Sequence, residues 1–156
     1  MAANPRQGPD AGRPELRERS EQFELAQEAL GIVTWIWDIP ADHVQWYGDA
    51  SRLLGLAAGR FSGRFGDYLA QVHPQDAASA RKTFVDCLKG LQPSYRAIER
   101  VCWPDGSVHW LETYGRAEYG SDGRAVRMAG VVKDVSEQQR SEAVRVWAEQ
   151  MLAQVF

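Results

Sequence analysis

Residues 95–135 read YRAIERVCWPDGSVHWLETYGRAEYGSDGRAVRMAGVVKDV. The Asp-Gly pairs that begin at Asp105 and Asp122 each stand between runs rich in β-branched and aromatic residues. An Asp-Gly pair in this setting is the strongest short-range signal for a β-hairpin. The sequence therefore predicts three successive antiparallel strands, at 95–103, 108–119 and 124–135.

A helix is expected to begin directly after the third strand, without a linker. Ser136 stands where a helix N-cap is wanted, and Gln139 follows it at the spacing of a capping box. Over 136–156 the apolar residues with coiled-coil spacing are Val144, Trp147, Met151 and Val155. The stripe covers only about two heptads. A contact with a partner helix and packing within the chain's own domain therefore both stay open.

The sequence before residue 95 predicts two strands and three helices. The strands are expected at 32–39 and 43–47, and the helices at 50–54, 65–72 and 74–90. Asp49 is the expected N-cap of the first of these helices, and Gly55 is its expected end.

The N-terminal part divides into a tail and a helix. Residues 1–14 are rich in Pro and Gly and predict a disordered tail. Residues 15–30 predict a charged helix with a thin apolar stripe of Leu16, Phe23 and Leu30. Such a helix must pack on something, either its own domain or a second helix in a dimer. The predicted organisation is thus a tail (1–14), a flanking helix (15–30), a central domain (31–135) and a C-terminal helix (136–156).

Composition and charge narrow the classes of partner. The formal net charge is −3 and no basic stripe is present, so a nucleic acid is not expected as a partner. No apolar run approaches the roughly 20 residues that cross a bilayer, so direct membrane insertion is not expected. The polar N-terminus does not fit a signal peptide. Cys87 and Cys102 are too few for a disulfide scaffold and suit the cytoplasm, where we expect the protein to reside.

Signals of catalysis and metal binding are weak. His43, His73 and His109 lie on different predicted elements, without a Cys, His or carboxylate at metal-ligand spacing. We read no Ser/His/Asp set, phosphate-binding loop or supported carboxylate pair. The domain is therefore expected to bind no metal and not to be an enzyme. An enzyme with its active site in the domain interior would need a convergent acid/base pair.

Five segments carry a resemblance to a known family. WPDGSVHWL (103–111) and MAGVVKDVS (128–136) resemble the C-terminal half of a PAS domain, and Asp134-Val135-Ser136 is similar to the Asp-Ile-Thr motif that ends such domains. GIVTWIWD (31–38), WYGDASRLLG (46–55) and VHPQD (72–76) resemble earlier parts of the PAS fold-3, or PAS-PAC, type found in bacterial signalling proteins. The resemblance implies an α/β (α+β) fold: a five-stranded antiparallel sheet with helices on one face, plus flanking amphipathic helices at both ends.

The resemblance also implies a cup on one face of the sheet, where PAS relatives bind ligands. Strand alternation selects its lining, because Arg127 and Lys133 put Met128 and Gly130 on the opposite face of their strand. The pocket candidates are Trp35, Trp37, Tyr68, Phe84, Leu111, Thr113, Gly115, Met128 and Gly130. The small residues Gly115, Ala117 and Gly130 are expected to leave volume on this face of the sheet. Either a ligand occupies that volume, or the large side chains Trp35, Trp37, Phe84 and Met128 fill it.

Haem and flavin are disfavoured as cofactors. Haem-binding relatives place a His on the long mid-domain helix, and residues 74–90 contain none. Flavin-binding light sensors carry a cysteine in an Asn-Cys-Arg-like setting before that helix. Cys87 instead lies near its end. We expect no bound cofactor, and leave a small ligand open.

A regulatory role follows as an expectation from the resemblance. The module would sense a small molecule or partner and pass the signal through residues 136–156 to a covalently linked output domain outside this chain. That output domain would be a second PAS domain, a diguanylate cyclase or phosphodiesterase, or a histidine kinase. Asp134, Val135 and Ser136 would form the signal junction, with Asp134 holding it and Ser136 capping the helix. The alternative is a ligand-free dimerisation or spacer module with a filled core.

A homodimer is the expected assembly. Trp110 and Tyr114 fall on the strand face opposite Leu111 and Thr113, where they would be exposed unless a flanking helix covers them. The interface candidates are Leu16, Phe23, Leu30, Trp110, Tyr114, Val144, Trp147 and Met151.

Overall fold

The computed structural model describes residues 13–57 and 59–155. The chain divides into two compact units that meet between Gly31 and Ile32. The first contains helix α1 (Arg13–Leu30), which begins two residues before the predicted start at Glu15. The predicted tail lies outside the described residues except for its last two, and these are helical. Pro14 suits the first turn of a helix, because it has no N–H that needs an intrahelical partner.

The second unit is built on one five-stranded antiparallel sheet in the order β2-β1-β5-β4-β3. Its strands are β1 (Ile32–Asp38), β2 (His43–Tyr47), β3 (Ser94–Cys102), β4 (Val108–Tyr119) and β5 (Ala125–Asp134). The two predicted hairpins, β3-β4 and β4-β5, are confirmed. The pairing of β1 with β5 joins segments that are far apart in the sequence, and it places both strands inside the sheet.

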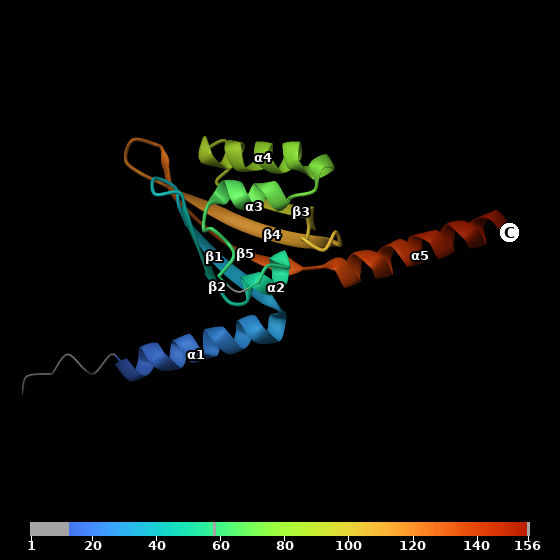
Figure 1. Cartoon of the computed structure of the whole chain (residues 1–156), viewed down its shortest axis with the longest axis horizontal. Helices are drawn as coiled ribbons and strands as arrows, with labels where there is room; N and C mark the ends of the chain where they lie inside the picture. The colour runs from blue at the N-terminus through green and yellow to red at the C-terminus, as the bar shows by residue number, and fades with distance from the viewer. Residues whose placement is uncertain (1–12, 58, 156) are drawn as a thin grey trace, which may run out of the picture. The chain divides into compact units, whose positions relative to one another are not determined.

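Four helices accompany this sheet: α2 (Ala50–Leu54), α3 (Phe65–Gln71), α4 (Pro74–Leu88) and α5 (Ser136–Val155). Figure 1 shows α3 and α4 next to each other over one face of the sheet. The predicted ends of α2 are confirmed. The Asp49 carboxylate accepts a hydrogen bond from the Arg52 N–H at 3.1 Å, and Gly55 ends the helix with a left-handed φ of 63°.

The core lies between the helix-covered face of the sheet and α2–α4. Alternation along the strands buries Trp35, Leu111 and Met128, and α4 contributes the buried Phe84. None of the described helices is both long and apolar enough to cross a membrane.

An ion pair fastens the start of α4 to β3. The Asp76 carboxylate accepts from the Arg100 backbone N–H at 2.9 Å and from the guanidinium at 2.7 and 3.0 Å. These bonds lower the pKa of Asp76 from 3.8 to about 2. The Arg100 guanidinium also lies 5.4 Å from the centre of the Trp110 ring, a cation–π contact. One arginine therefore links the helical layer to the face of the sheet that carries Trp110.

Asp76→Asn is expected to lower the free energy of unfolding by about 1–2 kcal/mol at neutral pH, after allowance for solvent screening. Because the folded-state pKa of Asp76 is depressed, this stabilisation is present above pH 3.8 and disappears as the pH falls towards 2. Urea unfolding of both proteins across this range measures the difference. Asp86→Asn, which removes the pair with Lys82 elsewhere on α4, is the control and should cost less than about 0.5 kcal/mol. A loss that is constant with pH would contradict this account.

Candidate functional site

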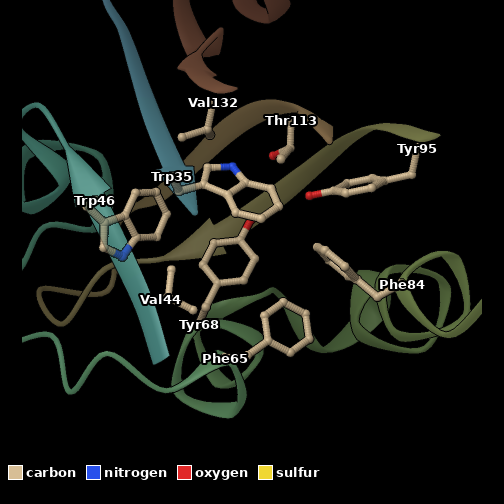
Figure 2. Close-up of a pocket in the computed structure, with 9 residues that line it drawn as sticks. All are labelled: Trp35, Val44, Trp46, Phe65, Tyr68, Phe84, Tyr95, Thr113 and Val132. Carbon is tan, nitrogen blue, oxygen red and sulfur yellow. The ribbon is translucent and has the colours of Figure 1, made fainter. Parts of the chain in front are cut away.

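An apolar pocket lies between the sheet and helices α3 and α4. It is lined by Trp35, Val44, Trp46, Phe65, Tyr68, Phe84, Tyr95, Thr113 and Val132 (Figure 2). All five strands contribute to this lining, together with α3 and α4. The free volume among these side chains is about 20 Å³. That is room for about one water molecule.

Aromatic rings that pack on one another form most of the wall. Phe84 lies 4.5 Å from Tyr95 on one side and 4.5 Å from Phe65 on the other, measured between ring centres. Phe65 also stacks on Trp37 at 4.2 Å. The rings hold one another in place, so α3, α4 and β3 together fix the shape of the pocket.

The structure brings together four of the nine predicted pocket residues, namely Trp35, Tyr68, Phe84 and Thr113. Trp37, Leu111 and Met128 are buried in the surrounding core and do not line the free volume. Gly115 and Gly130 lie on β4 and β5 beside it. As ligand contacts, all nine residues stay predictions.

Large side chains fill the volume next to Gly115 and Gly130, which is one of the two expected alternatives. A Cβ atom on Gly115 would lie 2.4 Å from the Tyr95 ring, and one on Gly130 would lie 2.6 Å from the Trp35 ring. The space next to each glycine is therefore already taken by an aromatic side chain, and the glycines permit close packing instead of creating a cavity.

Sequence reasoning missed several lining residues. Val44 and Trp46 come from β2, which supplies none of the predicted pocket residues, and Phe65 comes from α3. Tyr95 could have been predicted, because Arg96 is exposed and neighbouring residues of a strand point to opposite faces of the sheet. The same argument from Arg127 selected the lining residues of β5. The same alternation would have placed Glu99 inside.

A buried carboxyl group lies behind the pocket wall. Glu99 is 3% exposed and accepts a hydrogen bond from the Tyr68 hydroxyl at 2.5 Å. Burial raises the pKa of Glu99, and the bond from Tyr68 opposes this shift. Burial, followed by the charge of Glu99, raises the pKa of Tyr68 well above its usual value. The interior therefore favours the uncharged form of both groups.

Other buried polar atoms of the pocket have no partner. Trp46 Nε1, Tyr95 Oη and Thr113 Oγ1 are all buried without a hydrogen bond of normal geometry. The Thr113 hydroxyl is near enough to Tyr68 to lower the pKa of that phenol slightly, against the larger effect of burial. Buried polar groups are normally paired, so three such atoms around one pocket point to a missing partner.

The sheet passes into α5 through a hydrogen-bonded junction. The Val135 N–H donates to the Trp110 carbonyl at 2.8 Å, and the Ser136 N–H donates to Asp134 Oδ1 at 2.8 Å. The Trp110 N–H in turn donates to Ser136 Oγ at 2.9 Å. The other Asp134 oxygen lies 3.5 Å from His109 Nδ1. Asp134 therefore holds the turn by a hydrogen bond, as expected.

The predicted capping role of Ser136 is wrong. Its buried hydroxyl bonds to β4, and it already belongs to the helix as its first residue. The Val135 carbonyl accepts the first helical hydrogen bond, from the Gln139 N–H at 2.9 Å, so Val135 occupies the N-cap position. The reason is that β4 extends past the end of β5, where Leu111 pairs with Asp134, and the Ser136 hydroxyl accepts the hydrogen bond of the next β4 residue, Trp110.

The interface candidates lie in three places. On α5, Val144, Trp147 and Met151 are 66%, 62% and 44% exposed. On α1, Leu16, Phe23 and Leu30 are exposed as well. Tyr114 is exposed on the outer face of β4, whereas Trp110 is half-buried beneath Arg100. Their role in a dimer, and the covering of β4 by α1, stay predictions.

The described residues contain no group of three or more His, Cys, Asp or Glu side chains placed to hold a metal ion. Within that part of the chain, the pocket lining offers aromatic faces, hydroxyl groups and an indole N–H, but no carboxylate, histidine or cysteine. The groups that line the site can therefore offer packing and hydrogen bonds, but no charge.

The family model of the PAS fold matches residues 43–132, which is more than half of the sequence, and the five-stranded sheet with its helices agrees with that fold. The chain belongs to this family, and the expected resemblance is confirmed. Among curated proteins no match is found.

Solved structures with the same fold come from signalling proteins. A sensory box histidine kinase/response regulator from Burkholderia thailandensis is 23% identical, with a TM-score of 0.70 over 85% of this chain and 98% of that one. The N-terminal domain of a diguanylate cyclase with a PAS/PAC sensor from Marinobacter aquaeolei is 17% identical, with a TM-score of 0.62 over 69% and 98%. A domain of a putative light and redox sensing histidine kinase from Haloarcula marismortui is 20% identical, with a TM-score of 0.60 over 74% and 98%. At these identities the similarity is one of fold.

Proposed function

We propose that this PAS domain is a sensory module. A small molecule in the pocket favours one arrangement of the sheet, and α5 carries that bias to a covalently linked output domain. The observation that carries the proposal is the pair of hydrogen bonds at Ser136. Its N–H is bonded to Asp134 at the end of β5, and its hydroxyl is bonded to the Trp110 N–H of β4. The first residue of α5 is thus held by two of the strands that line the pocket, and a shift between them would reach the helix.

The similar structures suggest the kind of output domain, and the exposed face of α5 suggests the assembly. Their names include a histidine kinase and a diguanylate cyclase, so we propose an output domain of one of these classes, or a second PAS domain. We also propose a homodimer through α5, because its exposed apolar residues recur at coiled-coil spacing. The cytoplasmic location stays a prediction.

We further propose that the domain is not an enzyme and holds neither haem nor flavin. Catalysis in the pocket would need an acid/base pair, and Glu99 is a single carboxyl group that is already bonded to Tyr68. The described lining contains no histidine to ligate haem and no cysteine to react with flavin. The free volume of about 20 Å³ is far too small for a group of the size of haem or flavin.

A second candidate is a dimerisation or spacer module with a filled core. The free volume of about 20 Å³ favours it, because an organic ligand needs more room. Thermal melting with a set of small metabolites separates the two functions. A ligand at a hundredfold excess over its Kd stabilises by about 2.7 kcal/mol, whereas a filled core gives no shift.

Ser136→Ala is expected to disconnect α5 from the pocket. It leaves the Trp110 N–H without a partner and should cost about 1–2 kcal/mol of stability. Binding of a molecule found by melting should shift the amide resonances of the first turn of α5 in the wild type. In Ser136→Ala these shifts should shrink, while the Kd stays close to the wild-type value. Two-dimensional NMR measures both.

Ser141→Ala, at an exposed position of the same helix, is the matched control and should behave like the wild type. The transmission proposal fails if the α5 resonances do not respond to the bound molecule, or if they respond fully in Ser136→Ala.

A further inference from the structure

Two buried hydroxyl groups, those of Tyr95 and Thr113, face the pocket, and the Thr113 hydroxyl lies close enough to that of Tyr68 to lower the pKa of Tyr68. Tyr95 and Thr113 are each 3% exposed, and neither hydroxyl makes a hydrogen bond of normal geometry. In Figure 2 both side chains point towards the Trp35 indole, from β3 and β4. Burial raises the pKa of Tyr95 well above its usual value, so its phenol keeps its proton. A phenol that keeps its proton is a hydrogen-bond donor that lacks an acceptor.

The rest of the pocket disfavours a charged ligand. Its described lining has no charged side chain. The nearest buried acid, Glu99, lies behind Tyr68 and has one oxygen bonded to that hydroxyl. An anion would find no cation to pair with, and a cation would give up its hydration for aromatic faces and hydroxyls alone. Burial of an unpaired charge is costly, so an uncharged molecule is favoured.

We propose that the pocket binds a small, uncharged, planar molecule that offers a hydrogen-bond acceptor, such as a ring nitrogen or a carbonyl oxygen, to the hydroxyls of Tyr95 and Thr113. Its flat faces pack on the aromatic walls formed by Trp35, Tyr68 and Phe84. The inference rests on the proposed sensory function and names the chemical class of the molecule sensed.

Entry of such a molecule requires one wall to move. With every side chain in place the free volume of about 20 Å³ admits about one water. Trp46 is the wall residue best placed to yield, because it is half-buried and lies on the edge strand β2. Its ring meets Phe61 edge-on at 5.7 Å and Tyr68 at 6.3 Å. Only molecules in which Trp46 is displaced can bind, so the apparent affinity is the affinity of this open form multiplied by the fraction of molecules that are open.

The test uses four probes of similar shape that differ in charge and acceptor. Pyridine, at a pH where it is uncharged, has a ring acceptor, and benzene lacks one. N-methylpyridinium is a permanent cation and benzoate is an anion. NMR titration of the full chain, followed at the amides of Tyr95 and Thr113, gives each Kd. We expect pyridine to bind about 3- to 10-fold more tightly than benzene, the value of one neutral hydrogen bond. The two charged probes should leave these amides unshifted.

Matched variants assign the preference to the two hydroxyls. Tyr95→Phe and Thr113→Val should each reduce the ratio of the benzene Kd to the pyridine Kd, and the double variant should bring it close to one. Tyr119→Phe is the control, because the Tyr119 hydroxyl donates to the Cys87 carbonyl and does not line the pocket. It should leave the ratio unchanged. Tyr95→Phe should keep or raise the melting temperature, since it removes an unpaired buried hydroxyl, whereas Tyr119→Phe should lower it.

The possible outcomes separate this inference from the sensory function. A charged probe that binds more tightly than pyridine overturns the ligand class and leaves the sensor intact. A wild-type ratio of one, or a ratio that Tyr95→Phe does not change, also overturns it. If no probe binds to the wild type or to Trp46→Phe, which enlarges the pocket, the hydroxyls serve at most a bound water and the ligand class is overturned, whereas the sensory function fails only if no metabolite shifts the melting temperature.

Discussion

Gly130→Ala is expected to lower the free energy of unfolding by about 3 kcal/mol, a large overpacking effect. The added Cβ would lie 2.2 Å from the Tyr114 carbonyl oxygen and 2.6 Å from Cζ2 of the Trp35 ring. The carbonyl belongs to the β4 backbone and cannot move without opening the ladder between β4 and β5. Trp35 pairs with Gly130 across β1 and β5, so its indole lies directly over the glycine. Urea unfolding followed by circular dichroism gives the difference in stability.

Gly66→Ala should change the free energy of unfolding in the opposite direction to Gly130→Ala. Gly66 lies in α3, and a Cβ there would meet no atom within 4 Å. Alanine should therefore stabilise the protein by about 0.4–1 kcal/mol, because it restricts the unfolded chain without a clash. If Gly130→Ala proved as mild as Gly66→Ala, the close packing of Trp35 on the sheet would be wrong. The size of the pocket would then need to be revised upwards.

The contrast between Gly130 and Gly66 shows why the sequence predicts the fold more completely than it predicts the pocket. The hairpins follow from the turns at Asp105 and Asp122, which are local signals, and the inward face of each strand follows from alternation. Side-chain direction within the cup is not local. The Trp35 ring covers Gly130 because of the register between β1 and β5, which lie far apart in the sequence, whereas Tyr95 covers Gly115 across the β3-β4 hairpin. The sequence shows a small residue at each position but not which neighbour fills the space.

Ser136 gives the same lesson at the junction. Its place before a helix and three residues ahead of Gln139 predicts a capping box, and the helix does begin at Ser136. The hydroxyl is nevertheless bonded to the Trp110 N–H, because β4 extends past the end of β5. The relative lengths of two paired strands decide this contact. They could not be read from a motif that covers four residues.

Substitutions on the exposed apolar face of α5 are expected to have the largest effect on the dissociation constant of the proposed homodimer. Val144, Trp147 and Met151 recur at spacings of three and four and are 66%, 62% and 44% exposed. Apolar side chains on one face of a helix with no neighbour of their own are the pattern of a coiled-coil seam. In protein–protein interfaces, tryptophan is one of the residues enriched at the few positions that carry most of the binding energy.

Trp147→Ala should therefore weaken the proposed homodimer roughly 30-fold or more, which corresponds to a loss of at least about 2 kcal/mol. The fold of the second unit should be unchanged, because Trp147 is outside the described core. Sedimentation equilibrium over a range of concentrations gives the dissociation constant, and circular dichroism checks the fold. Val146→Ala is the matched control, since Val146 lies on the opposite side of the helix, away from Val144 and Met151. A wild-type chain that stays monomeric would refute the dimer. Equal weakening by both variants would refute the seam.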